Sequence, residues 1–251
     1  MMNNHEIINY YKQGNSLAAV ERKYGISPYK FKKILKQENV HIRSRHEQCI
    51  LENQRRGYAI NHDYFNELND TKAYWLGLLA ADGTVRKDRN AIKIGLKAED
   101  EYLLVQLKNC LQSEAPIKYY TVNNRFPVAE FEFSSKQIKE TLKYYSIVPN
   151  KTYIGITMKN IPDQYKLAFI KGFFDGDGSF TTGKVKIVSK TEGILKEIQD
   201  FLSQKTYLYH TSKDLYSLEM SIVPSRDFLK SIYQLETPCL IRKYNHYKES
   251  Y

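Results

Sequence analysis

Apolar residues recur at helical spacing in three short segments at the start of the chain. These segments are Glu6–Gln13, Leu17–Tyr24 and Pro28–Gln37. Gly14 and Gly25 interrupt the pattern, and Ser27 followed by Pro28 is a typical beginning of a helix. The pattern therefore predicts three helices in a small all-α domain that spans residues 1–45.

The third segment is strongly basic, and its outward positions include Tyr29, Lys30, Lys32 and Lys33. Two helices joined by a short turn, the second of them basic, match a helix-turn-helix. The segment resembles the trihelical DNA-binding domains of site-specific recombinases, which implies that these four residues bind DNA. We expect the Arg43-Ser44-Arg45 tail to enter a neighbouring groove as an arm. A small helical module that binds another protein is the alternative.

A second pattern occurs twice in the rest of the chain. Residues 46–69 are polar and charged, and we interpret them as a linker. Beyond them an apolar helix that ends in Asp-Gly is found at Ala73–Gly83 and again at Ala168–Gly178. Alternating strands and amphipathic helices follow each copy in the order α-β-β-α-β-β-α. This predicts an α+β fold with two pseudo-symmetric halves, residues 70–160 and 161–251.

Small residues line one face of each repeated helix. They lie four apart, as Gly77 with Ala81 and as Gly172 with Gly176. Such a stripe lets two helix backbones approach closely, and glycine inside a helix costs about 1 kcal/mol relative to alanine. Gly83 and Gly178 follow the two helices, and we expect them to adopt the left-handed conformation that ends many helices.

Each repeated helix carries an aspartate, Asp82 or Asp177, in its last turn. A carboxylate there faces the negative end of the helix dipole, at a cost of roughly 0.3–1 kcal/mol. Two such ends brought together add like-charge repulsion. The arrangement makes sense if a divalent cation lies between the acids. Reading Asp and Gly only as helix-stop signals would explain one motif, but not the small-residue stripe on both.

Composition limits the class of protein. The chain has 251 residues, 42% of them hydrophobic, and a formal net charge of +10, which favours an anionic partner. Its three cysteines include no C-x-x-C pair, so we expect neither a disulfide framework nor a structural zinc site. The sequence shows no membrane-spanning run and no signal-peptide pattern, so we expect an intracellular protein without a membrane partner.

The two helix motifs resemble those of the LAGLIDADG homing endonucleases, and the resemblance covers roughly residues 70–245. Two motifs in one chain resemble the single-chain members, so we expect a monomer with two saddle-shaped sheets. The first copy has Ala80 where the family usually has an acid, whereas the second keeps Asp175. The resemblance implies a site-specific endonuclease that cuts double-stranded DNA with Mg²⁺ held by Asp82 and Asp177. Its biological role would be mobility of the encoding intron or free-standing gene.

Four lysines match family positions where a basic or polar residue polarises water or stabilises the phosphate. They are Lys97, Lys151, Lys190 and Lys243. The resemblance therefore implies a catalytic role for each of them. An ordinary solvated lysine is the alternative at every one of these positions.

Alternation along the strands predicts a face that reads DNA. It directs Ile92 and Ile94 to the core and the neighbouring lysines outward, and it extends the strands over Val128–Phe133 and Leu218–Ile222. A twisted antiparallel ribbon can lie in the major groove, and two such ribbons would cover a long asymmetric duplex site. The candidate DNA contacts are Lys93, Lys184, Lys186, Lys118, Tyr120, Arg125 and His210.

Two other functions use the same scaffold without cleavage. One is an intron RNA maturase, which would tolerate loss of the acids. The other is a transcriptional regulator that uses the helix-turn-helix and a catalytically silent core. Nuclease activity would exclude both of them as the main function.

Overall fold

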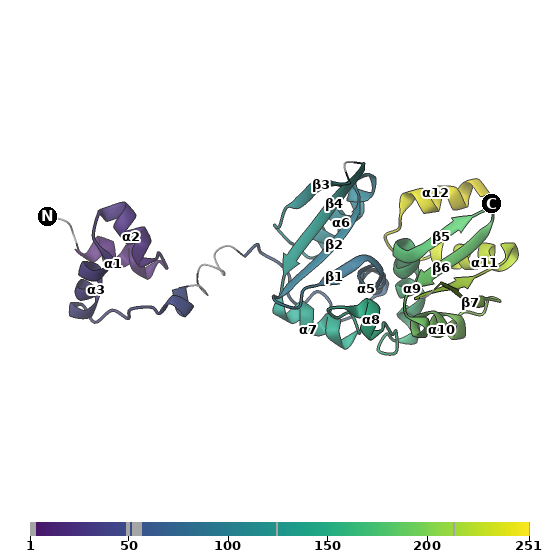
Figure 1. Ribbon diagram of the computed structural model, residues 1–251, viewed down its shortest axis with the longest axis horizontal. Helices are drawn as coiled ribbons and strands as arrows, with labels where there is room; N and C mark the ends of the chain where they lie inside the picture. The colour runs from purple at the N-terminus through teal and green to yellow at the C-terminus, as the bar shows by residue number, and fades with distance from the viewer. Residues whose placement is uncertain (1–3, 49–50, 52–56, 124, 213, 251) are drawn as a thin grey trace. The chain divides into compact units, whose positions relative to one another are not determined.

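The computed structural model describes residues 4–48, 51, 57–123, 125–212 and 214–250. The chain divides into two compact units, Met1–Tyr58 and Ala59–Tyr251 (Figure 1). Each unit has its own hydrophobic core. Among the described residues, no helix is both long enough and apolar enough to cross a membrane.

Three helices form the N-terminal unit, as predicted. They are α1 (Asn4–Lys12), α2 (Leu17–Tyr24) and α3 (Pro28–Gln37). The Ser16 and Ser27 side chains accept hydrogen bonds from the first turns of α2 and α3, and Gly25 ends α2 with a φ of 68°. One apolar face of each helix meets in a core of Ile7, Ile8, Tyr11, Val20, Phe31 and Leu35.

The tail after α3 does not extend as the expected arm. Arg43 folds back onto its own unit, where Nη2 donates to the carbonyl oxygens of Tyr11 at 2.9 Å and Asn15 at 2.7 Å. Its guanidinium also lies 3.9 Å from the centre of the Tyr11 ring. Ser44 and Glu47 then cap each other, with Ser44 N donating to Glu47 Oε2 and Glu47 N donating to Ser44 Oγ. The expectation is wrong for Arg43 because a buried aromatic ring and two carbonyls bind it; Arg45 remains exposed.

The second unit repeats one arrangement of helices and strands. Its first half contains α5 (Asp70–Asp82), β1 (Gly83–Val85), β2 (Ala91–Lys97), α6 (Glu101–Cys110), β3 (Ile117–Val122), β4 (Phe126–Ser134), α7 (Lys136–Tyr144) and α8 (Lys151–Ile154). Its second half contains α9 (Asp163–Asp177), β5 (Gly178–Thr181), β6 (Lys184–Ser189), α10 (Glu192–Phe201), β7 (Tyr207–Ser212), β8 (Leu215–Glu219), α11 (Ile222–Tyr233) and α12 (Ile241–Ser250). The two-half α+β prediction is confirmed.

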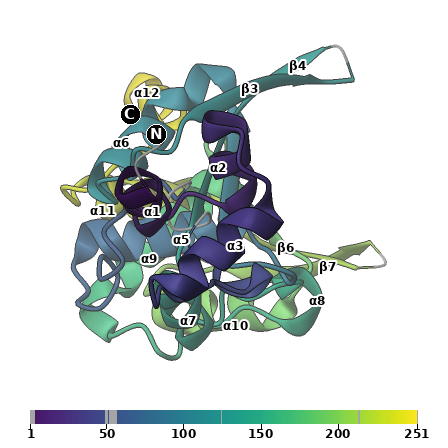
Figure 2. The ribbon, with the colours of Figure 1, turned by 90° about the vertical axis from the view of Figure 1, so that its left-hand side faces the viewer.

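Each half forms one four-stranded antiparallel sheet. The strand orders are β1-β2-β4-β3 and β5-β6-β8-β7, so the two sheets share one topology. The sheets lie on opposite sides of the α5–α9 pair (Figure 1), and the β3–β4 hairpin projects as a long ribbon (Figure 2). In β2 and β6 the predicted alternation is present, since Ile92, Ile94, Val185 and Ile187 are buried.

Three local predictions differ from the structure. The strand expected over Leu218–Ile222 ends at Glu219, and Ile222 already begins α11. There the Ser225 hydroxyl replaces a strand partner by accepting from Val185 N and donating to Met220 O. The short helices α8 and α12 were not expected at all, because their periodicity is weak.

Helices α5 and α9 pack backbone to backbone, as the small-residue stripe predicts. A Cβ built at Gly77 would overlap the Phe169 carbonyl, and one built at Gly172 would overlap the Tyr74 carbonyl. Only glycine permits this contact at either position. The close packing brings the ends of the two motif helices to the same place.

Gly83 and Gly178 do not adopt the left-handed conformation that we expect from the sequence. Both residues are extended, with φ and ψ of −72° and 149° at Gly83 and of −98° and 160° at Gly178. Glycine is needed because a Cβ would collide with the preceding turn, at Leu79 O and at the Phe174 side chain. The chain therefore passes from helix directly into β1 and β5, without a left-handed residue.

Candidate active site at the paired helix ends

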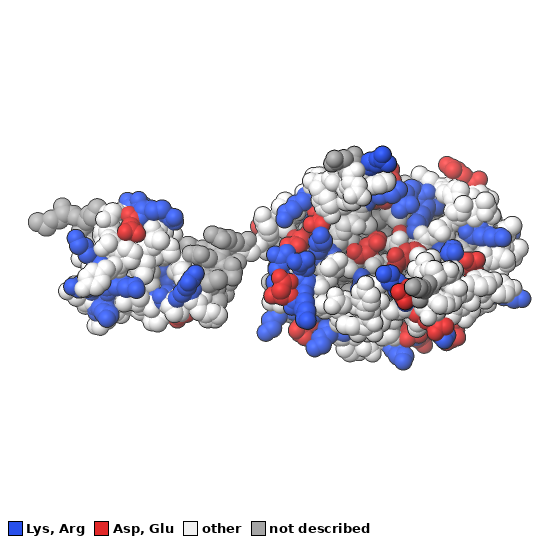
Figure 3. All heavy atoms as spheres, viewed as in Figure 1, with Lys and Arg blue, Asp and Glu red and all other residues white. Residues whose placement is uncertain are grey.

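The two motif aspartates are the last residues of neighbouring helices, Asp82 of α5 and Asp177 of α9. A Cβ built on Gly176 would lie 3.0 Å from Asp82 Oδ2. The Asp82 carboxylate thus lies against the last turn of α9, one residue before Asp177. Acidic side chains gather in the hollow between the two halves (Figure 3).

The surroundings make both carboxylates harder to ionise. Loss of hydration raises the pKa of Asp82, and it raises the pKa of Asp177 to about 6 with a further contribution from the charge of Asp82. Lys151 and Lys243 lower both pKa values, but their effect is smaller than that of desolvation. Two desolvated acids, one of which makes the other harder to ionise, favour a bound cation.

Lys151 and Lys243 lie directly beneath the two helix ends. Lys151 Nζ donates to the carbonyl oxygens of Ala81 at 3.1 Å and Gly83 at 2.6 Å. Lys243 Nζ donates to three carbonyl oxygens, those of Phe174 at 2.6 Å, Asp175 at 2.8 Å and Gly178 at 2.6 Å. Both ammonium groups are buried, and desolvation lowers the pKa of Lys243 to about 8.

Each lysine therefore caps the carbonyl end of one motif helix. Cations at a helix C-terminus offset the partial negative charge of the unpaired carbonyls. The structure thus gives the two lysines a structural contact that the sequence did not predict. Both lysines also lie close enough to the acids for their charge to lower the pKa of Asp82 and of Asp177.

The comparisons with known proteins agree with this architecture. The model of the LAGLIDADG-like domain matches residues 70–143 and 164–232, which together make up more than half of the chain. The chain belongs to the LAGLIDADG family. The two matched segments fall in the first and second halves of the second unit.

Solved LAGLIDADG structures share the fold. I-DmoI in complex with DNA and Ca aligns with a TM-score of 0.52 at 19% identity, covering 74% of this chain and 97% of that one. The meganuclease I-SmaMI bound to uncleaveable DNA aligns with a TM-score of 0.52 at 14% identity, covering 72% of this chain and 88% of that one.

A curated relative covers less of the molecule. The uncharacterized protein MJ0314 of Methanocaldococcus jannaschii is 26% identical over 159 residues, which make up 61% of this chain. The aligned region spans 55% of that relative.

The sixth motif position differs between the two LAGLIDADG helices. Asp175 is 1% exposed, and its Oδ2 accepts from Tyr74 Oη at 2.8 Å and from Leu240 N at 2.9 Å. The buried Lys171 donates to the carbonyls of Leu235 and Thr237 at 3.3 Å each. Asp175 therefore joins α5, α9 and the segment that leads into α12, rather than facing the hollow with Asp82 and Asp177.

Sequence reasoning missed Arg242 as a site residue. Its Nε donates to Asp100 Oδ2 at 3.1 Å, and its positive charge lowers the pKa of Asp82. The residue before the capping lysine is Arg242 in the second half but Asn150 in the first. That difference between two otherwise matching positions is the sequence signal that could have identified it.

Lys97 and Lys190 remain predictions as catalytic residues. Both are exposed, Lys97 lies 3.5 Å from Glu99, and the Lys190 ammonium lies 5.6 Å from the centre of the Tyr153 ring. Among the described residues, no ion pair connects either lysine to Asp82 or Asp177.

The two aspartates have the chemistry of a hard-cation site. Hard divalent cations prefer carboxylate and carbonyl oxygens. Within the described part of the chain, neither acid is held in an ion pair, and no group of three or more His, Cys, Asp or Glu side chains could hold a metal. The capping lysines donate their hydrogen bonds to carbonyl oxygens rather than to the two carboxylates.

The outer sheet faces carry the residues expected to contact DNA. Lys93 pairs with Glu130 at 2.6 Å and Lys186 with Glu219 at 2.9 Å, and Tyr120 Oη also donates to Glu130. The other candidates on the strands and their hairpins, Lys118, Arg125, Lys184 and His210, are exposed. Tyr119, Val122, Phe126, Tyr207 and Tyr209 add exposed apolar surface to β3, β4 and β7.

The outward residues of α3 are exposed as predicted. Tyr29 is 70% exposed, and the Lys33 ammonium lies 4.8 Å from the centre of its ring. Lys30 and Lys32 are also exposed.

Proposed function

We propose that this LAGLIDADG protein is a site-specific, Mg²⁺-dependent endonuclease that cuts double-stranded DNA. The observation that carries the proposal is the pairing of Asp82 and Asp177 at two closely packed helix ends. Their burial, their raised pKa values and the lack of an ion pair to either acid among the described residues support a role in holding a cation. I-DmoI and I-SmaMI are bound to DNA in their structures, and I-DmoI is seen with Ca.

Asp82 and Asp177 would hold divalent cations together with nearby backbone carbonyls, one acid for each DNA strand. Such a cation supplies an activated water and charge stabilisation for the phosphate in the transition state. Lys151 and Lys243 fix the two helix ends that carry the acids, and they add positive charge beneath the phosphate-binding hollow. Lys97 ends β2 and Lys190 directly follows β6, and from there they would orient water or contact the phosphate.

The two sheets would bind the duplex through their exposed polar faces. Lys93 pairs with Glu130, which lies diagonally across from it, and Lys186 pairs with Glu219, which lies directly opposite, so a glutamate of the neighbouring strand fixes each lysine donor. Fixed donors favour the reading of base edges, whereas freely solvated lysines contribute mainly to phosphate attraction. Because the side chains on the two sheets differ, the target would be long and asymmetric.

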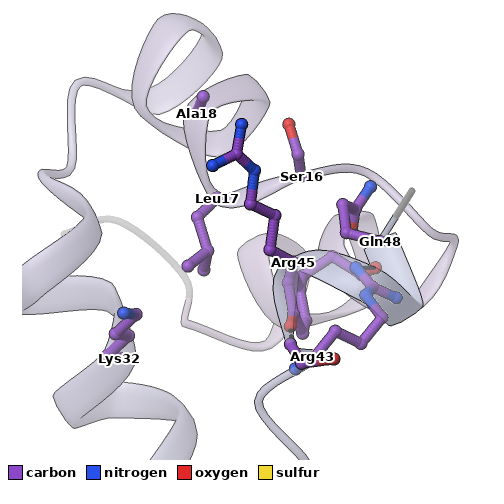
Figure 4. Close-up of a pocket in the computed structure, with 9 residues that line it drawn as sticks. Ser16, Leu17, Ala18, Lys32, Arg43, Arg45 and Gln48 are labelled. Atoms are coloured by element: carbon purple, nitrogen blue, oxygen red, sulfur yellow. Dashed lines mark hydrogen bonds between the residues drawn. The ribbon is translucent and has the colours of Figure 1, made fainter. Parts of the chain in front are cut away.

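The N-terminal unit would add a second DNA contact through α3. A pocket of about 490 Å³ lies in this unit, and three cations, Lys32, Arg43 and Arg45, line it without any acid. In Figure 4, Arg45 extends toward Ser16 and Ala18 at the start of α2, while Lys32 reaches the pocket from α3. This charge favours a phosphate of the DNA backbone.

Cleavage of a randomised duplex library tests the proposal. The wild-type protein is compared with Asp82→Asn, each with Mg²⁺ and with Ca²⁺. We expect sequence-restricted double-strand breaks that need both Mg²⁺ and Asp82. Specific DNA binding without cleavage would instead favour the regulator, and binding of RNA alone would favour the maturase.

The role of the N-terminal unit is tested separately. We expect Lys32→Ala combined with Arg45→Ala to weaken binding of the selected duplex and to reduce its dependence on salt. Lys12→Ala, on the exposed end of α1, is the matched control. Equal affinity of the double variant and the control would contradict this part of the proposal.

A further inference from the structure

In the second half, the capping lysine Lys243 follows a segment that is hydrogen-bonded to residues of the first half. Tyr102 Oη donates to Cys239 O at 3.1 Å and accepts from Ile241 N at 2.6 Å. Two residues earlier, the buried Asp100 accepts from Arg242 Nε. Asp100 and Tyr102 come from the start of α6, so an element of the first half fixes the position of Arg242.

The matching positions of the other half carry different residues. The matching helix α10 begins after Thr191 and has Gly193 where α6 has Tyr102. Asn150 takes the place of Arg242 before the capping lysine. The clamped arginine is thus a feature of one half, although the acids and capping lysines occur in both.

Arg242 lines a pocket of about 290 Å³ between β5 and α12. Lys243, His246 and the residues of β5 form the rest of its lining, and none of these is acidic. Gly178, the first lining residue, directly follows Asp177. The pocket therefore opens beside one of the two acids and carries net positive charge.

The helix that carries the capping lysine is much shorter in the first half than in the second. Helix α8 ends at Ile154, where Gly155 turns the chain with a φ of 110°, so it is only four residues long. Helix α12 has ten residues, and its second turn places His246 against Phe180 of β5, with ring centres 4.9 Å apart.

Lys243 and Arg242, which both line the pocket, differ in how many of their N–H donors are already hydrogen-bonded within the protein. The Lys243 ammonium is bound to three carbonyls, and Arg242 donates only its Nε to Asp100 among the described residues. The Arg242 side chain is 44% exposed. A guanidinium that is anchored at Nε keeps its terminal nitrogens for the paired oxygens of a phosphate.

We propose that this pocket binds one backbone phosphate of the DNA, with Arg242 as its cation, and that it makes cleavage of the two strands unequal. The inference rests on the endonuclease function proposed above. Arg242 acts here on the strand that passes β5 and α12, whereas the other strand meets Asn150 and the short α8. The two acids match each other, but only one of the two DNA strands would have this additional phosphate contact.

Single-turnover cleavage of a duplex labelled on each strand tests the inference. We expect Arg242→Gln to slow the nicking of one strand about tenfold or more, while the other changes less than about threefold. A nicked intermediate would then accumulate. Arg226→Gln, which removes an exposed arginine of α11 in the same half, is the matched control and should leave both rates unchanged. An equal slowing of both strands, or no slowing, would overturn the inference.

A binding measurement separates this inference from the nuclease proposal. Methylphosphonate groups are placed one at a time along the selected duplex, and affinity is measured with Ca²⁺. We expect one position at which a neutral phosphate weakens binding of the wild-type protein but not of Arg242→Gln. If every position affects both proteins equally, the pocket binds no phosphate, whether or not the protein cuts DNA.

Discussion

The two halves of the second unit are alike at the hollow and different behind it. Each motif helix ends in an aspartate, contacts its neighbour through glycine and is capped by a buried lysine. Behind this shared surface, Tyr74 faces Asp175 on one side, whereas the matching residues on the other side are Phe169 and Ala80. The repeated residues therefore mark the proposed chemistry, and the unrepeated ones mark packing and asymmetry.

The family's sixth-position acid illustrates this difference. In the second half Asp175 is buried and bonded to Tyr74 and Leu240, so it organises the segment that leads to Lys243. In the first half Ala80 needs no polar partner, and the residue that matches Tyr74 is Phe169, which has no hydroxyl. Loss of the acid from the first motif is consequently a change in packing that leaves Asp82 in place.

The largest expected effect comes from removing the repeated acids. Asp177→Asn and Asp82→Asn keep the size of each side chain but remove the charge that would hold the cation. We expect each to reduce double-strand cleavage by about 100-fold or more, with DNA affinity in Ca²⁺ changed only a few-fold. Strand-specific cleavage rates and a binding titration measure the two effects. Wild-type cleavage by either variant would contradict the metal assignment.

The hydrogen-bonded pair of Tyr74 and Asp175, which occurs on one side only, should affect stability more than cleavage. Asp175→Ala leaves a buried Tyr74 hydroxyl and a buried Leu240 N–H without a partner, at a cost of about 2–4 kcal/mol in the free energy of unfolding. Tyr74→Phe added to Asp175→Ala introduces the residue types found at the matching positions, Phe169 and Ala80. We expect the double variant to recover part of the loss in urea denaturation. Additive losses would show that the pair is not coupled.

The capping lysines offer a graded comparison between the halves. Lys243→Met removes three hydrogen bonds to carbonyls, and Lys151→Met removes two. Each change leaves buried carbonyls unpaired, so we expect losses of about 1–3 kcal/mol, larger for Lys243→Met. Thermal unfolding compares the two variants. A larger loss for Lys151→Met would contradict the capping role.

The pH dependence of cleavage follows from Asp177. Its pKa of about 6 means that the carboxyl group gains a proton, and loses its charge, as the pH falls through 6. Cleavage at low Mg²⁺ should therefore decrease below about pH 6. A higher Mg²⁺ concentration should move this decrease to lower pH, because the cation competes with the proton. If the decrease in cleavage below pH 6 does not move with the Mg²⁺ concentration, it comes from a group other than Asp177.

The smallest expected effect is that of the Asp177 charge on the free energy of unfolding. The pKa of Asp177 is raised on folding, so its charged form destabilises the folded state, and this cost develops as the pH rises from about 4 to about 6. Asp177→Asn should then increase stability at pH 7 by an amount on the order of 1 kcal/mol, since solvent screens the partly exposed group. At pH 3.5 the difference between the variant and the wild type should vanish.

The sequence predicts the pairing of the two motif helices better than it predicts the elements around them. Asp82, Asp177 and the glycine stripes are found because each is costly in an ordinary helix and occurs twice. Helices α8 and α12 escape prediction because each presents little apolar periodicity and is held by a lysine that points at backbone carbonyls. The extended Gly83 and Gly178 escape because a steric collision with Leu79 or Phe174 leaves no mark in the local pattern.

Arg242 and Arg43 show a further limit. Both side chains are basic, and from the sequence alone a basic residue is expected to lie on the surface. In the structure each is fixed by a partner far along the chain, Arg242 by Asp100 and Arg43 by Tyr11. Such long-range pairs follow from the fold rather than from the spacing of neighbouring residues.

The most direct test of the central claim is cleavage of the randomised duplex library by the wild-type protein and by the Asp82→Asn, Asp177→Asn double variant. If the claim holds, the wild type makes breaks at a restricted sequence with Mg²⁺, and the double variant binds that sequence without breaks. Breaks that survive in the double variant, or a wild-type protein that binds the same sequence with Mg²⁺ and leaves it intact, would contradict it.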